Sequence, residues 1–167
     1  MIESVLQLRE EGINISIDIA GVAFKDILAY ESIQRRGLQE SPSGINCFGR
    51  MSHFDSIRLV MKSDFSVFLR RDARYANAGF PTKFVESIGV GTPVIANLTS
   101  DLGNYLDDGE TGFVVADCSV EELKRSLMRA HLVSASSYEA MREKSRKLAE
   151  SRFDFRQFST GFSDFLH

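Results

Sequence analysis

The stretch GFPTKFVESIGVGTPVIAN, residues 79–97, contains the pattern that decides the fold. It begins with a glycine–proline turn and continues into a predicted helix from Lys83 to Val90. Gly91 ends that helix, and Pro93 opens an apolar strand, PVIAN. A helix that runs directly into a buried strand is typical of α/β proteins. The stretch therefore indicates either an ordinary crossover helix or a helix whose start binds an anion.

The same alternation of helical and β-rich segments continues on both sides of this stretch. Capping boxes at Ser52, Ser119 and Ser136 mark three further helix starts. The predicted strands are 13–21, 45–49, 64–70, 93–97 and 113–116. The predicted helices are 2–11, 23–38, 53–61, 83–90, 120–132 and 137–151. This order predicts a single α/β domain over residues 1–167, a Rossmann-like doubly wound parallel sheet with helices on both faces.

Composition excludes several function classes. The chain has 167 residues, 43% hydrophobic and 26% charged, with a formal net charge of −3. That mild acidity favours no nucleic-acid partner, and no apolar run reaches the roughly 20 residues of a membrane span. The N-terminus carries charges where a signal peptide needs an apolar core, so a cytoplasmic location is expected. The two cysteines and three histidines are scattered and predict no metal site.

The segment before the helix of residues 83–90 is the strongest candidate for ligand binding. In parallel sheets, ligands bind beyond the carboxyl ends of the strands, which is where LRRDARYANAGFPTK (69–83) follows its strand. With Thr82 as N-cap, the free amides of residues 83–85 would favour a phosphate group, together with Arg70 and Lys83. Gly79 would allow close backbone approach. A solvated cationic loop before a capped helix explains the same residues equally well.

Two further positions have both a functional and a plain interpretation. Glu86 lies one turn into the helix, where its carboxylate could accept hydrogen bonds from the two hydroxyls of a ribose. The alternative is a surface glutamate paired with a nearby cation, Arg70, Arg71 or Lys83. The turn Gly49–Met51 could contact a planar base, or simply connect a strand to a helix. No Ser-His-Asp, Cys-His or paired-carboxylate pattern indicates a self-contained hydrolase or dehydrogenase.

Taken in order, these segments resemble the C-terminal half of a GT-B-fold glycosyltransferase of the retaining family 4 (group 1). The most specific match is GFPTKFVESIGVGTPVIANLTSDLGNYLDDGETGFVV, residues 79–115. It is similar to that family's Gly-Phe loop, its helix with a glutamate, its G-x-PVIA strand and its following G-x-TG turn. INISIDIAG (13–21), INCFGRMSHFDSIRLVMKSDFSVFLR (45–70) and the closing helices fit as well, so the resemblance covers essentially the whole chain.

The resemblance implies a domain that binds a nucleotide-diphosphate sugar. Glu86 matches the second glutamate of the family's Glu-x7-Glu motif, which holds the nucleotide ribose. Arg70 stands after a strand, where it would add a diphosphate contact. The loop expected to face the sugar and diphosphate is Gly79, Phe80, Pro81, Thr82 and Lys83. The loop expected to receive the base is Gly49, Arg50 and Met51.

Two departures from the family pattern limit what the resemblance implies. Ala78 replaces the motif's first glutamate, which touches the donor sugar, so the donor stays open. The family's phosphate-stabilising Arg/Lys pair, its first strand and its N-terminal acceptor domain all precede the matched region. The chain is therefore expected to be a fragment of a two-domain enzyme. Residues 153–167, with Phe155, Phe158, Phe162 and Phe165, would form a helix that docks on the missing domain.

The implied reaction is retaining transfer of a sugar to a hydroxyl acceptor, with no cofactor and no required metal. The isolated chain is expected to be inactive, and the full-length enzyme to act in polysaccharide biosynthesis in the cytoplasm or at a membrane surface. Two alternatives stay open. One is half of a GT-B-like sugar-nucleotide 2-epimerase, and the other is a non-catalytic α/β interaction module without nucleotide affinity.

Overall fold

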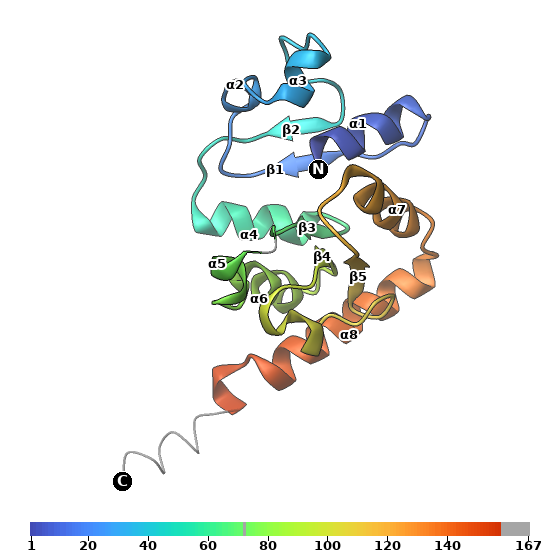
Figure 1. The fold of residues 1–167 in the computed structure, drawn as a ribbon. Coiled ribbons are helices and arrows are strands. Elements are labelled where there is room, and N and C mark those ends of the chain that lie inside the picture. Colours follow the sequence, from blue (N-terminus) through green and yellow to red (C-terminus); the bar gives the residue numbers. More distant parts are fainter. Residues whose placement is uncertain (72, 158–167) are drawn as a thin grey trace.

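The protein is described here from a computed structural model, which covers residues 1–71 and 73–157 (Figure 1). In these residues, five short strands alternate with helices. The strands are β1 (Ile17–Ile19), β2 (Ile45–Cys47), β3 (Ser66–Phe68), β4 (Val94–Asn97) and β5 (Gly112–Val115). The longer helices are α1 (Ile2–Glu10), α4 (His53–Lys62), α6 (Thr82–Gly89), α7 (Val120–His131) and α8 (Ala135–Arg152). The shorter ones are α2 (Phe24–Ile27), α3 (Glu31–Arg35), α5 (Arg74–Asn77), η1 (Ser100–Asn104) and η2 (Phe155–Gln157).

All strand pairs are parallel, which confirms the predicted α/β class. The ladders form two sheets, β1–β2 and β3–β4–β5, within the described residues. β4 is central in the larger sheet, with Val94 opposite Ser66 on one side and Gly112 on the other. All four of its residues are buried, as expected for a strand covered on both faces. Sequence periodicity predicted the strands but could not show that they divide into two sheets.

The helix starts show which sequence signals were reliable. Ser52 caps α4 and Ser119 caps α7, each accepting the backbone amide three residues on, at 3.1 and 3.2 Å. The predicted start of the last long helix at Ser136 is wrong, because Ser134 Oγ accepts the Ser137 amide instead. The predicted helix over 23–38 is also wrong. Tyr30 is extended there, so that α2 ends before it and α3 starts after it.

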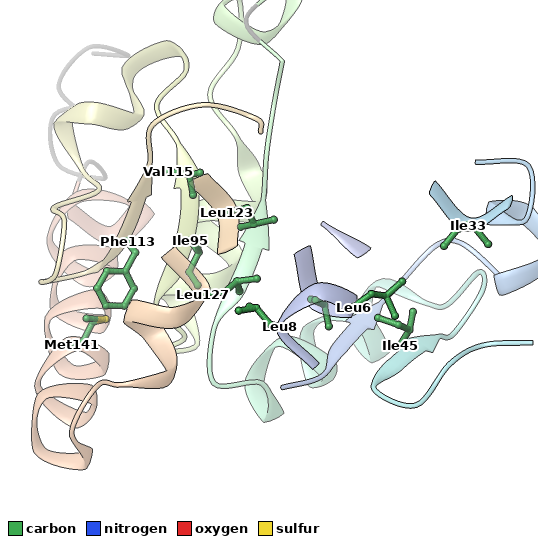
Figure 2. Close-up of a cluster of buried hydrophobic side chains, with 11 residues drawn as sticks. Leu6, Leu8, Ile33, Ile45, Ile95, Phe113, Val115, Leu123, Leu127 and Met141 are labelled. Atoms are coloured by element: carbon green, nitrogen blue, oxygen red, sulfur yellow. The ribbon is translucent and has the colours of Figure 1, made fainter. Parts of the chain in front are cut away.

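One hydrophobic core extends across both sheets (Figure 2). Helix α1 packs against α7, and Figure 2 shows Leu8 beside Leu127 at that contact. Ile45 of β2 and Ile95 of β4 belong to the same cluster. Although the ladders are separate, the two sheets are therefore joined by packed side chains.

A second core holds helix α6 in place. Phe84 and Ile88 of α6 are fully buried against Val94 and Ala96 of β4 and against Ala149 of α8. The remaining buried members are Leu102 and Leu106. Since α6 is packed on this side, its orientation relative to the sheet is set by the core, and this places the helix start at the carboxyl end of β4.

The end of the chain was expected to dock on another domain. Helix α8 ends at Arg152, and η2 follows it. Phe155 is 79% exposed, whereas Phe158, Phe162 and Phe165 lie outside the described residues. The docking role of residues 153–167 therefore stays a prediction.

Gly112 tests the register of the larger sheet. A Cβ at this position would lie 1.8 Å from the Val94 carbonyl oxygen and 2.8 Å from the Val94 nitrogen. Because both atoms belong to the backbone of the central strand, we expect Gly112→Ala to lower the free energy of unfolding by about 3 kcal/mol or more in urea denaturation.

Gly89→Ala is the matched control for this substitution. Gly89 is exposed at the end of α6, and a Cβ there would meet nothing within 4 Å. The free energy of unfolding of the Gly89→Ala protein should rise, by less than about 1 kcal/mol. A Gly112→Ala protein as stable as the unsubstituted chain would contradict the β4–β5 register.

Candidate functional site

The start of α6 presents backbone amides that have no partner in the described part of the chain. The helix begins at Thr82 with Pro81 as N-cap, so the prediction of Thr82 as N-cap is wrong. Pro81 has no side-chain acceptor, and its carbonyl accepts the Phe84 amide at 3.0 Å. Within residues 1–71 and 73–157, the amides of Thr82 and Lys83 donate to no acceptor. Two amides are thus free at the positive end of the helix dipole, where an anion is favoured.

Glu86 lies one turn after these amides and is partly buried. Among the described residues, none forms a hydrogen bond or an ion pair with its carboxylate. The pairing with Arg70, Arg71 or Lys83 that the plain interpretation required is therefore not present in the structure. Side chains of a helix lean towards its N-terminus. The Glu86 carboxylate is consequently directed to the end of α6 that carries the free amides.

Asn97 fixes the loop that follows β3. It is the last residue of β4 and only 8% exposed. Its Oδ1 accepts the Arg70 amide at 2.9 Å, and its Nδ2 donates to the Arg70 carbonyl at 2.7 Å. Cys118, after β5, donates its thiol to the same carbonyl at 3.4 Å. The side-chain amide of Asn97 therefore holds the backbone of Arg70 at the carboxyl edge of the sheet.

The Arg70 side chain binds the far end of the same loop, at Gly79. Its Nη1 donates to the Gly79 carbonyl at 3.0 Å, which brings together two residues predicted for the site. In the middle of the loop, Asn77 Oδ1 accepts the Ser100 amide at 2.9 Å. Ser100 has a φ of 54°, and among the described non-glycine residues it alone has a positive value. The Arg70 side chain therefore positions the loop through its Nη1 bond to the Gly79 carbonyl. The other N–H groups of its guanidinium take no part in that bond.

Sequence reasoning missed the role of Asn97, although one signal pointed to it. Asn97 is a polar residue that ends the apolar run PVIAN, at the edge where ligands bind in parallel sheets. A buried polar side chain needs hydrogen-bond partners, so its position predicts a structural contact at that edge. The identity of the partner depends on the loop conformation, which the sequence pattern does not give.

The side chain of Phe80 and the backbone of its loop have different roles. The prediction placed residues Gly79–Lys83 against a ligand through their backbone. The ring of Phe80 turns into the protein, where it lies next to Phe84, Tyr105 and Phe153. Gly79, Thr82 and Lys83 are exposed, whereas Pro81 is buried, so the backbone is at the surface at the two ends of this segment.

The predicted base loop is held by the turn after β1. Gly49, with a φ of 65°, donates to Val22 O at 3.0 Å and accepts from the Gly21 amide at 2.7 Å. Arg50 is exposed, and Met51 is partly buried. In the described part of the chain, no hydrogen bond or ion pair joins this loop to Arg70 or to residues 79–86. The structure therefore brings the residues of the α6 region together and leaves the base loop as a separate group.

Cationic side chains occur in the segment before α6 and in its first turn. Arg71, Arg74 and Lys83 are exposed, and no carboxylate of the described residues pairs with them. His, Cys, Asp and Glu side chains nowhere gather into a possible metal site within those same residues. The helices described also include none with the length and apolar character to cross a bilayer. The region is suited to an anionic ligand held by amides and cationic side chains.

Several solved structures share this fold. A structure of Anabaena Alr3699/HepE in complex with UDP and glucose matches with a TM-score of 0.71 and 17% identity, over 99% of this chain and 44% of that one. A glycosyltransferase from Rickettsia africae ESF-5 matches with a TM-score of 0.71 and 17% identity, over 98% and 42%. Sucrose-phosphate synthase from Thermosynechococcus elongatus gives 0.70 and 15%, over 99% and 41%.

These likenesses concern the fold, and the chain spans less than half the length of each of these three proteins. No curated protein matches the chain in sequence. The family is shown by a different comparison. The family model described as "Glycosyl transferases group 1" matches residues 1–148, which include both sheets and the whole α6 region. The chain therefore belongs to the group 1 glycosyl transferases.

Proposed function

We propose that the chain is the donor-binding half of a retaining glycosyltransferase and binds a nucleotide-diphosphate sugar at the start of α6. The observation that carries this proposal is that, among the described residues, the amides of Thr82 and Lys83 and the Glu86 carboxylate one turn later have no hydrogen-bond or ion-pair partner. Phosphate and ribose are recognised by these two kinds of group. The family membership supports a transferase as the parent protein.

In this proposal, the parts of the donor bind to different groups at the carboxyl edge. The diphosphate lies at the free amides, next to the cationic side chains of Lys83 and Arg70. The ribose hydroxyls donate to the Glu86 carboxylate. The sugar lies against the backbone of Gly79, Phe80 and Pro81, and the base lies at the Gly49–Met51 turn.

The chemistry assigned to this half is positioning and charge stabilisation. Transfer breaks the bond between the sugar and the diphosphate, so negative charge develops on the leaving phosphate. Amides and cations that are already in place can stabilise that charge without reorganising. The helix start and its cationic neighbours supply this stabilisation in the proposal, without a required metal. Ala78 leaves the sugar itself open, because the motif's first carboxylate is absent.

A larger parent is part of the proposal. The chain covers 44% or less of the three solved structures described above. β1 pairs only with β2 and β3 only with β4 among the described strands, so each has an edge without a partner. One further strand between them would join the two sheets. We assign the acceptor site, and the phosphate-stabilising Arg/Lys pair, to the N-terminal part of the parent.

Glu86 is the first residue to test. We expect Glu86→Gln to weaken binding of the preferred nucleotide among UDP, GDP and ADP by about 10-fold to 100-fold in calorimetric titration. The neutral amide would replace a charged acceptor of two hydroxyl groups, and bonds to charged groups contribute about 1.5–3 kcal/mol. Glu40→Gln is the matched control, since Glu40 is an exposed carboxylate in the loop before β2.

The control should bind as the unsubstituted chain does. Absence of binding to all three nucleotides at millimolar concentration would support the interaction-module alternative instead. Equal affinities of the Glu86→Gln and Glu40→Gln proteins would remove Glu86 from the site.

The isolated chain should not transfer sugar. A radiolabelled donor incubated with the chain and simple hydroxyl acceptors should yield no labelled glycoside, because the acceptor site lies in the other half. Turnover by the isolated chain would contradict this division of labour. With the longer parent, the product separates the remaining alternatives: a transferase yields a glycoside, and a 2-epimerase yields an epimeric sugar nucleotide.

A further inference from the structure

We infer that Phe153, at the end of α8, is a positioning residue for the loop that precedes α6. This inference rests on the proposed function, because it concerns the same nucleotide-diphosphate site. Phe153 lies in none of the segments assigned to the donor. It would act through Phe80, the middle residue of the Gly79–Pro81 loop.

Four aromatic rings from separate parts of the fold meet at this point. The ring of Phe153 stacks on that of Phe80 with centroids 5.6 Å apart and an interplanar angle of 29°. It lies 4.9 Å from the ring of Tyr105 and 6.3 Å from that of Phe84. Phe153 is therefore in contact with all three other rings, and these distances are typical of favourable aromatic pairs.

The cluster holds the loop from its protein side. Phe80 stands between Gly79, whose carbonyl accepts from Arg70, and Pro81, the N-cap of α6. Phe84 is fully buried and belongs to the core, whereas Phe80 and Phe153 are only partly buried. The Phe80–Phe153 contact thus lies at the margin of the core. Its loss should affect the loop more than the packing of α6.

The end of α8, which carries Phe153, is fixed by contacts with the core. Its amide donates to the Ala149 carbonyl at 2.9 Å, and Ala149 is buried against α6. Further back, the buried Ser145 donates to the Thr111 carbonyl at 3.2 Å, which ties α8 to the segment before β5. Because α8 is fixed in this way, the Phe153 ring can hold Phe80, and with it the loop, in one position. Without it, Phe80 can turn outward, and binding must then order the loop.

The test compares two leucine substitutions at partly buried phenylalanines. Phe153→Leu removes the ring next to the loop. Phe65→Leu removes a ring that contacts Phe113 at 5.8 Å and Tyr138 at 5.5 Å, just before the amino end of β3. Both lose aromatic packing, but only the first is next to the candidate site. Phe153→Tyr keeps the ring, and Phe153→Met replaces it if the leucine protein does not fold.

Two measurements read out the loop. In calorimetric titration with whichever of UDP, GDP and ADP the unsubstituted chain binds best, Phe153→Leu should bind at least about fivefold more weakly, while Phe65→Leu and Phe153→Tyr stay within about twofold of the unsubstituted chain. In limited digestion below the melting temperature of every variant, trypsin should cut after the exposed Arg74 at least about fivefold faster in Phe153→Leu than in Phe65→Leu.

The possible results separate the role of Phe153 from the proposed function. Equal nucleotide affinity and equal cleavage rate in the two leucine proteins would overturn the role of Phe153 and leave the proposed function intact. Equal weakening in both would also overturn it, as a general loss of stability. Absence of binding to UDP, GDP and ADP by the unsubstituted chain would instead overturn the proposed function, and with it the donor role of Phe153.

Discussion

The buried face of helix α6 determines what the site can be. Phe84 and Ile88 are four residues apart and fully buried against β4 and α8. In a helix, Thr82 and Glu86 then fall on the opposite face, because each lies about 200° around the axis from Phe84 or Ile88. The core thus sets the direction in which Glu86 points. The contacts that stabilise the fold thus turn the Glu86 side chain away from the core, one turn after the free amides.

Side chains from three parts of the chain fix the loop before α6. Asn97 holds the backbone of Arg70, and the Arg70 side chain holds the Gly79 carbonyl. The Phe80 ring packs on Phe153 from the protein side. These contacts use side chains from β4, the loop and α8, so the loop is organised by three parts of the chain. Backbone groups that must meet a phosphate benefit from such preorganisation, since binding then orders less of the chain.

The sequence allowed part of this to be predicted, namely what depends on local physics. Serines 52 and 119 were correctly identified as helix caps because the acceptor and its amide are three residues apart. Thr82 was not an N-cap, because Pro81 before it has the extended conformation of the cap, with φ −73° and ψ 103°. The two-sheet arrangement and the partners of Asn97 depend on long-range contacts. No local pattern encodes them, so they could not be predicted.

The central claim is that the first turn of α6 binds the nucleotide diphosphate. Titration of ¹⁵N-labelled protein with the nucleotide it prefers among UDP, GDP and ADP, followed in ¹H–¹⁵N correlation spectra, tests it most directly. The account predicts that the amides of Thr82 and Lys83 shift most, with Glu86 next. A contradictory result would be an unchanged spectrum, or largest shifts on α8 at Arg142 and Arg146, which line a separate groove with Gly91.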